Sequence, residues 1–229
     1  LEIPISAEMI RGFWLAAGGT LLGARHALTD GMAYNIGGGF HHAYPDHGEG
    51  FCAIHDVAVA LRKLIREGTI ERALVIDCDV HHGNGTAAIF AQDESVFTIS
   101  LHQWKNYPAV KPPSNVDVHL EDGTGDEEYL ARLKKAYRPT LDSFRPQLVA
   151  YVAGADPYRR DRLGGLSLTI DGLKARDRVV LDAAVARNIP VIVTLAGGYA
   201  EDVNDTIAIH VNTLIAARES LNGRPPVRD

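Results

Sequence analysis

Continuous apolar runs rich in β-branched residues constrain the fold of this chain more than any other feature of its sequence. We predict strands at five of them, over residues 33–36, 73–78, 96–101, 148–153 and 190–196. Polar and apolar residues do not alternate within these runs, so both faces of each strand are expected to be buried, as in a parallel sheet. Other segments have helical spacing, and we predict helices over residues 6–26, 50–67, 126–143, 171–188 and 201–219. This alternation predicts a three-layer α/β/α fold with a central, mostly parallel sheet.

The length of the chain fits one domain. Its 229 residues can bury a sizeable core, and no repeat or linker divides them, so we predict a single domain over residues 1–229. Residues 222–227, Asn-Gly-Arg-Pro-Pro-Val, are predicted to form a frayed tail. Because the chain begins with leucine and not with methionine, we expect its natural N-terminus to be missing.

Charge and cysteine content narrow the class of protein. The formal net charge is −6 and no run of basic residues stands out, which argues against direct nucleic-acid binding. No membrane span and no signal peptide are visible in the sequence. Cys52 and Cys78 lie in apolar segments, as expected of a reduced protein without a disulfide framework. These features together predict a cytoplasmic protein.

Glycine-rich and polar motifs follow the predicted strands. Seven of the ten histidines fall between positions 41 and 102, a density that scattered surface histidines would not produce. In strand order, the motifs are Gly37-Gly-Gly-Phe-His-His, Asp77-Cys-Asp-Val-His-His, Ser100-Leu-His, Gly154-Ala-Asp and Gly197-Gly-Tyr. Ligands bind at the carboxyl edge of parallel α/β sheets. We therefore predict a functional site at this edge.

Three of these residues form a candidate metal site. Asp79 and His81 are two positions apart in an extended chain and so share a face. Asp156 precedes a proline, which favours an extended backbone, and it is the natural third ligand. Carboxylate and imidazole ligands suit zinc, iron, manganese or cobalt. The alternative is that these aspartates only cap helices or form Asx turns.

The remaining motifs suit acid–base chemistry beside a metal. His41 and His42 follow three glycines; we expect them to point in different directions and to move protons rather than to chelate one ion. Asp77 and Asn84 are the candidate partners that orient their rings. Tyr199 is placed to donate a hydrogen bond to a developing oxyanion, although a lone tyrosine is more often a core residue. Together these residues predict a metal-assisted amide hydrolase.

These motifs resemble those of the histone deacetylase superfamily, which also includes acetylpolyamine amidohydrolases and acetoin-utilisation proteins. The similarity runs from about Gly12 to about Thr213. It rests on Gly38-Gly-Phe-His-His-Ala, Gly50-Phe-Cys, Val75-Ile-Asp-Cys-Asp-Val-His-His-Gly-Asn-Gly-Thr, Ser100-Leu-His, Ala155-Asp-Pro and Ala196-Gly-Gly-Tyr. The stretch from Asn106 to Tyr129 looks most like prokaryotic members near the class IV branch.

The resemblance implies the arginase/deacetylase fold and a role for each site residue. It implies Zn²⁺, with Fe²⁺ as an alternative, held by Asp79, His81 and Asp156. It makes His41 and His42 the general acid–base pair, with Tyr199 as the oxyanion donor. Asp77 becomes the partner of His41, and Asn84 stands beside His42. A structural K⁺ is implied near Asp77, Asp79, His81, Ser100 and Leu101, and an acyl-lysine tunnel is implied that Gly50 and Phe51 line.

The chain departs from the family pattern in three places. Asn84 stands where class I enzymes carry aspartate, and this uncharged partner should raise the basicity of His42 less. His55 replaces a commoner asparagine before Asp56. We find no counterpart of the strand, helix and loop that usually open such domains and that supply part of the tunnel rim. We therefore expect the catalytic domain to be incomplete at its N-terminus.

The expected substrate is an acylated lysine of a peptide or protein. An acetylated polyamine is the alternative, for which Asp46 and Glu49 are candidate acidic residues at the tunnel mouth. An arginase-like ureohydrolase would need further aspartates for a two-metal cluster. A non-catalytic acyl-lysine binding module would be expected to lack the tyrosine or a metal ligand, and this chain lacks neither.

Overall fold

The computed structural model describes residues 1–223; the predicted tail from residue 224 onward lies outside the described residues. Six parallel strands form one sheet in the order β1-β6-β5-β2-β3-β4. They are β1 (Met32–Asn35), β2 (Ala73–Asp77), β3 (Val96–Gln103), β4 (Val116–Leu120), β5 (Leu148–Val152) and β6 (Val191–Thr194). The predicted fold class is confirmed, and so is the parallel arrangement of the sheet.

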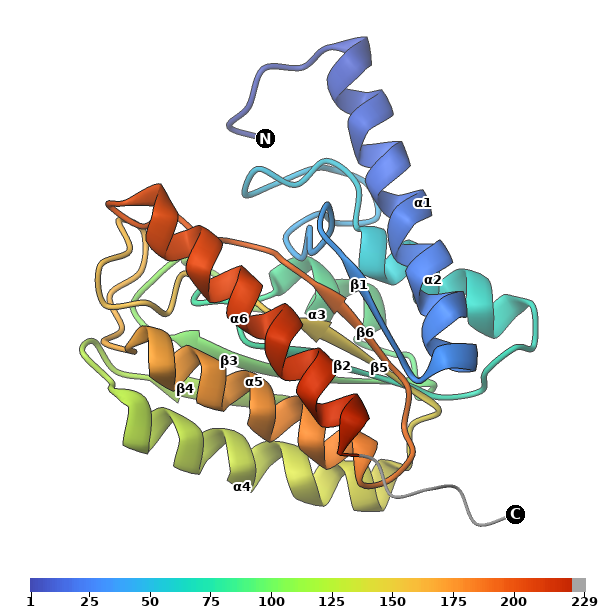
Figure 1. The fold of residues 1–229 in the computed structure, drawn as a ribbon. Helices are drawn as coiled ribbons and strands as arrows, with labels where there is room; N and C mark the ends of the chain where they lie inside the picture. Colours follow the sequence, from blue (N-terminus) through green and yellow to red (C-terminus); the bar gives the residue numbers. More distant parts are fainter. Residues whose placement is uncertain (224–229) are drawn as a thin grey trace.

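Helices cover both faces of this sheet (Figure 1). They are α1 (Ala7–Asp30), α2 (Asp56–Arg66), α3 (Asn84–Phe90), α4 (Asp126–Phe144), α5 (Ile170–Val185) and α6 (Val203–Asn222). Successive residues of β2 point to opposite faces. Leu74 and Ile76 pack in the core under α4, α5 and α6, while Ala73 and Val75 pack in the core under α1, α2 and α3. Burial on both faces explains why the central strands read as unbroken apolar runs.

Strand β4 was not predicted. It lies at the edge of the sheet and pairs only with β3 among the described residues. Its sequence, Val-Asp-Val-His-Leu, alternates apolar and polar residues, and most of its positions are only partly buried. A search for continuous apolar runs therefore passes over it. Helix α3 was missed for another reason: its seven residues are mostly buried and show no amphipathic period.

The predicted helix over 50–67 begins too early. Helix α2 starts at Asp56, because Gly50 and Phe51 both have left-handed backbone angles, φ 53° and 65°, which no helix accommodates. His55 is the N-cap, and its Nδ1 accepts a hydrogen bond from the Ala58 N–H at 3.2 Å. The histidine that departs from the family pattern thus starts this helix.

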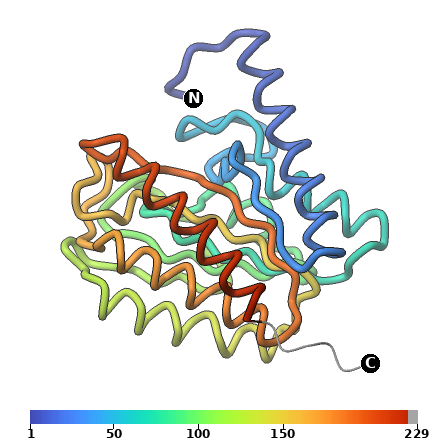
Figure 2. Tube along the Cα trace, in the orientation of Figure 1, coloured from blue at the N-terminus to red at the C-terminus, as the bar shows by residue number. Residues whose placement is uncertain are grey.

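The other predicted helices are close to those observed. The Ser6 hydroxyl caps α1, accepting from the Met9 N–H at 3.1 Å, and the helix continues four residues past the predicted end to Asp30. Gly31 then ends it with φ 91°. The tube in Figure 2 shows the first residues folding back over the loop that follows β1, where Leu1 approaches Gly48.

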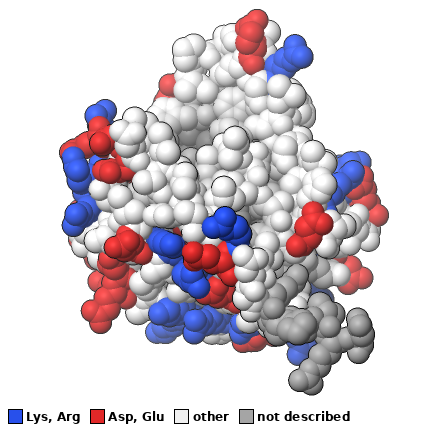
Figure 3. Space-filling model, in the orientation of Figure 1, with Lys and Arg blue, Asp and Glu red and all other residues white. Residues whose placement is uncertain are grey.

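The exposed surface is uneven. Charged side chains gather along the lower part of the view in Figure 3, over α4 and α5. Several large apolar side chains are exposed on α1 and α6, namely Trp14, Leu15, Leu22, Ile207, Val211 and Leu214. Among the described residues, no helix combines the length and the apolar character needed to cross a membrane.

Candidate active site

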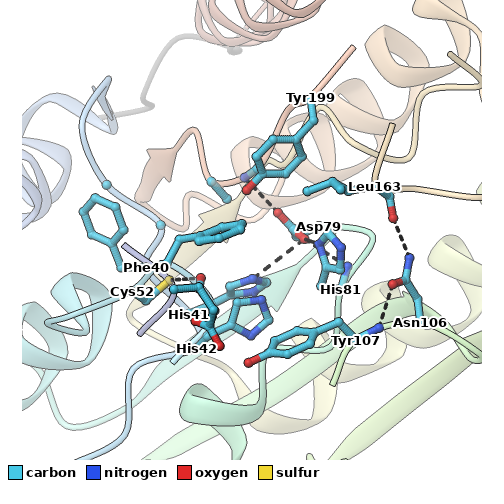
Figure 4. A pocket seen from close by; sticks show the side chains of 17 residues that line it. Phe40, His41, His42, Cys52, Asp79, His81, Asn106, Tyr107, Leu163 and Tyr199 are labelled. Atoms are coloured by element: carbon cyan, nitrogen blue, oxygen red, sulfur yellow. Dashed lines mark hydrogen bonds and ion pairs between the residues drawn. The ribbon is translucent and has the colours of Figure 1, made fainter. Parts of the chain in front are cut away.

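The carboxyl edge of the sheet carries a cavity of about 340 Å³. His41, His42, Asp79, His81 and Tyr199 all line it, although they come from segments that follow β1, β2 and β6. Figure 4 shows the histidines and Asp79 facing a common space, with Tyr199 approaching from the opposite side. The cavity wall is completed by Glu2, Phe40, Asn106, Tyr107 and Leu163, together with glycines and small residues. None of these five was singled out from the sequence as a site residue.

Asp79, His81 and Asp156 meet at the base of this site. One ligand atom from each lies within 4.8 Å of the other two. His81 Nδ1 is 3.0 Å from Asp79 Oδ1 and 3.2 Å from Asp156 Oδ2. Backbone groups fix both carboxylates: Asp79 Oδ2 accepts from the Gly197 N–H and Asp156 Oδ1 from the Val80 N–H, each at 2.8 Å. The three side chains converge because β2, β5 and β6 are neighbours in the sheet.

The electrostatics of this trio suit a cation. Asp156 is fully buried, and its Oδ2 accepts no hydrogen bond; His81 Nδ1, 3.2 Å away, belongs to the same trio. Burial and the neighbouring Asp79 carboxylate raise the pKa of Asp156. Two buried carboxylates this close repel one another unless a positive charge lies between them. Two carboxylate oxygens and one imidazole nitrogen match a catalytic zinc site that keeps further positions for water and substrate.

A second group, His82, His102 and Asp117, also clusters within 4.8 Å. Here the polar atoms largely satisfy one another. His82 Nε2 lies 3.2 Å from Asp117 Oδ1, and His102 Nδ1 lies 3.0 Å from Ser100 Oγ. His102 Nε2 is also 3.0 Å from His119 Nδ1. This hydrogen-bonded network ties β2, β3 and β4 together, so the Asp79 trio is the better candidate for the catalytic metal.

The paired histidines each have a partner on the outer ring nitrogen. His41 Nδ1 donates to Asp77 Oδ2 and His42 Nδ1 to Asn84 Oδ1, both at 2.6 Å. We had expected the two rings to point in different directions. Instead they lie side by side, with centroids 4.0 Å apart. Both therefore present their remaining nitrogen toward the cavity that they line.

The loop that carries these histidines is held by Asp56, the first residue of α2. This fully buried carboxylate accepts hydrogen bonds from the Gly39 and Phe40 N–H groups at 3.0 and 2.8 Å. Gly39 has φ 103°, and a side chain there would meet the backbone of Ala196 at 2.6 Å. Asp56 thus sets the turn that brings both rings to the cavity. An acidic residue at the start of an apolar helix is the only sequence signal for this role.

The environments of the two histidines push their pKa values apart. Burial alone would lower the pKa of His41, but the Asp77 and Asp79 carboxylates outweigh it and raise the pKa to about 9. Burial and the charge of His41 lower the pKa of His42 well below its usual value. At neutral pH, His41 is therefore a cation and His42 a neutral imidazole. Because their pKa values differ in this way, His42 can accept a proton while His41 carries a fixed positive charge.

Tyr199 and Phe51 both line the cavity. The Tyr199 N–H donates to Asp161 Oδ2 at 2.6 Å, which fixes the backbone of this segment. Burial and the Asp79 carboxylate raise the pKa of Tyr199, so its phenol keeps its proton and can donate it to a hydrogen bond. The Phe51 ring is 42% exposed and lies 6.3 Å from the Tyr199 ring, between centroids. With Gly50, it lines the cavity.

Arg176 also supports the site, and we did not predict this role from the sequence. This fully buried side chain of α5 donates to the carbonyl oxygens of Gly154 at 2.5 Å and Cys78 at 3.3 Å. Those two carbonyls flank the segments that carry Asp156 and Asp79. A charged residue on the buried side of this helix was the available signal.

Comparisons with known proteins identify the family of this chain. The model of the histone deacetylase domain matches residues 1–214. An uncharacterized protein of Picosynechococcus sp. is 42% identical over 219 residues, which cover 96% of this chain and 73% of that protein. Histone deacetylase 2 of Arabidopsis thaliana is 33% identical over 213 residues, which cover 92% of this chain and 55% of that protein. The crystal structure of the HDA15 HD domain superposes with a TM-score of 0.77 at 29% identity, covering 93% of this chain and 64% of that one.

The chain belongs to the histone deacetylase family, as its motifs suggested. Its sheet is that of this family's fold. The chain spans about half the length of the Arabidopsis relative.

Proposed function

We propose that this protein is a zinc-dependent amidohydrolase that removes acetyl or longer acyl groups from lysine side chains. One observation carries the proposal: Asp156 Oδ2, which accepts no hydrogen bond, completes a trio of zinc-type donors beside the cavity that the His41–His42 pair lines. When bound there, zinc would polarise the amide carbonyl and make water a stronger acid. Fe²⁺ suits the same donors and is the alternative metal.

The protein's own residues would move the protons. Neutral His42 accepts a proton from the attacking water as the oxygen adds to the amide carbon. Tyr199 donates a hydrogen bond to the carbonyl oxygen while negative charge develops on it. The C–N bond then breaks, and His42 returns the proton to the leaving amine. Cationic His41, held by Asp77 at 2.6 Å, stabilises the negative charge nearby.

A structural K⁺ is part of the proposal. Its expected residues are Asp77, Asp79, His81, Ser100 and Leu101. Asp77 and Ser100 are register partners on the adjacent strands β2 and β3, which supports a shared ion at this point. Such an ion would sit behind the proposed zinc site and help to fix its ligands.

An acyl-lysine is the proposed substrate, and Glu2 is an acidic residue of the cavity wall that would serve a polyamine instead. The wall of the cavity also includes Phe40, Phe51 and Leu163, which suit the aliphatic stem of an acyl-lysine. The two acidic residues considered for a polyamine do not line it: Asp46 is 83% exposed and bonds to His47, while Glu49 is engaged by neighbouring side chains. A cytoplasmic location is proposed as well, since both cysteines are free thiols and buried.

The experiment that tests this function is a substrate panel. Zinc-loaded protein is assayed with acetyl-lysine peptide, fatty-acyl-lysine peptide and acetylated polyamines. We expect turnover of acyl-lysine, and Asp156→Asn should lose zinc and activity together. If only acetylated polyamines are hydrolysed, the substrate class is an acetylated polyamine and not an acyl-lysine. Absence of turnover on every acyl-amine by protein that binds one zinc would favour a binding module.

A further inference from the structure

Glu49 lies in the loop between His42 and Phe51, and its backbone is fixed. Its N–H donates to the Cys52 carbonyl at 3.0 Å, and the Cys52 N–H donates back at 2.8 Å. The Glu49 side chain is 27% exposed and turns inward. A rigid backbone therefore presents this carboxylate to the residues behind the cavity.

One oxygen of this carboxylate receives two donors. Glu49 Oε1 accepts from Asn84 Nδ2 and from the Tyr107 hydroxyl, each at 2.7 Å. Glu49 Oε2 faces His47 Nε2 at 3.5 Å. An ionised carboxylate only accepts hydrogen bonds, so each neighbour must turn a donor toward it.

This requirement fixes the orientation of the Asn84 amide. Because its nitrogen must face Glu49, its oxygen must face His42, whose Nδ1 lies 2.6 Å from Asn84 Oδ1. An amide oxygen accepts, so His42 Nδ1 must carry the hydrogen. In neutral imidazole the other nitrogen, Nε2, then has a free lone pair. That is the tautomer able to take a proton in the cavity.

We propose that Glu49 is a positioning residue that acts through Asn84 to hold His42 in its Nδ1-protonated tautomer. The inference rests on the proposed function, in which His42 accepts the proton of water. It explains how an uncharged asparagine can serve where class I enzymes carry aspartate. The negative charge lies on Glu49 instead of on residue 84. It orients the Asn84 amide, whose oxygen then accepts the hydrogen bond from His42.

Loss of Glu49 would release the amide. A flipped Asn84 turns its NH₂ group toward His42, whose Nδ1 must then accept and whose Nε2 carries the hydrogen. That tautomer cannot take a proton from water. Because Glu49 contacts none of the three proposed zinc ligands, the defect should appear in kcat, with zinc content unchanged.

The test compares Glu49→Ala, Glu49→Gln and the double variant Glu49→Ala/Asn84→Asp, all zinc-loaded. Glu49→Ala should lower kcat about 10- to 100-fold, as expected when a hydrogen bond to a charged group is lost. Glu49→Gln keeps an oxygen acceptor and should stay close to wild type. Aspartate at position 84 has acceptors at both ends, so it cannot present a donor to His42 and should restore most of the kcat lost in Glu49→Ala.

Nitrogen-15 NMR of the His42 ring supplies a readout that needs no turnover. We expect the Nδ1–H form in wild type and in the double variant, and Nε2–H in Glu49→Ala. Unchanged ring shifts and kcat in Glu49→Ala would overturn the proposal, and so would failure of Asn84→Asp to restore them. If wild type hydrolyses no acyl-amine, the proposed function fails, while the ring shifts still decide whether Glu49 sets the tautomer.

Discussion

At the scale of single residues, the site works by giving two adjacent histidines different surroundings. His41 is bonded to a carboxylate and His42 to an amide, although their rings lie 4.0 Å apart. The charge on His41 itself disfavours a second charge on His42. Near neutral pH, the raised pKa of His41 keeps its ring cationic, and the lowered pKa of His42 keeps its ring neutral and able to accept a proton. A single substitution beside either ring should alter one role and spare the other.

The pH dependence of activity tests this division. Because the pKa of His41 is raised to about 9, chiefly by Asp77 against the effect of burial, kcat/KM should fall as the pH rises through that value. Asp77→Asn keeps an acceptor oxygen but removes the charge, so the alkaline limb should move to lower pH. The measurement is a pH profile of kcat/KM for both proteins. An alkaline limb at the same pH in the variant would contradict the assignment.

At the scale of elements, strand ends carry the ligands and helices hold those ends in place. Asp56 at the start of α2 fixes the histidine loop. Arg176 in α5 holds the carbonyls beside Asp79 and Asp156, and its charge is balanced by Asp177 at 2.8 Å. Both supports are buried and charged, so the geometry of the site and the stability of the domain are linked.

Arg176→Met tests this link. Removing one partner of a buried pair leaves Asp177 without its cation, which should cost about 3–5 kcal/mol of unfolding free energy. Zinc affinity should fall as well, since the ligand segments lose an anchor. Arg178→Met is the matched control on the same helix: its side chain is 45% exposed, and the loss of its ion pairs with Asp182 and Glu219 should cost about 1 kcal/mol or less. Urea unfolding of the metal-free proteins measures the unfolding free energy of both variants. Equal losses of unfolding free energy would refute the structural role of Arg176.

The elements also show what the sequence can predict. Central strands were predictable because burial on both faces leaves continuous apolar runs, as in β2 and β5. The edge strand β4 and the left-handed turn at Gly50 and Phe51 left no such pattern. Site residues that follow strands were predictable from the edge they share. Glu49 and Arg176 were not, because their partners lie far away in the chain and only the packed structure joins them.

At the scale of the whole molecule, the site exists only when the fold is complete. The proposed metal trio joins residues 79, 81 and 156, and residues 41, 42 and 199 line the cavity beside it. Two apolar cores on opposite faces of the sheet hold these segments together. An ion that binds the assembled trio and not the unfolded chain must therefore stabilise the fold.

Zinc should raise the melting temperature. At 100 times the dissociation constant, a ligand of the native state adds about 2.7 kcal/mol. For a domain of this size each kcal/mol corresponds to roughly 2–4 °C, so a shift on the order of 5–10 °C is expected. The measurement is thermal unfolding with zinc and with chelator. Asp156→Asn should abolish the shift; an equal shift in that variant would place the stabilising ion elsewhere.

The central claim is that zinc held by the trio and the Tyr199 phenol act together on an acyl-lysine amide. The most direct test is a zinc titration of kcat for an acetyl-lysine peptide, in wild type and in Tyr199→Phe. We predict that wild-type kcat rises until one zinc is bound per chain. Tyr199→Phe should bind zinc equally well with kcat roughly 10²- to 10³-fold lower. Full activity in metal-free protein, or an unchanged kcat in Tyr199→Phe, would contradict the account.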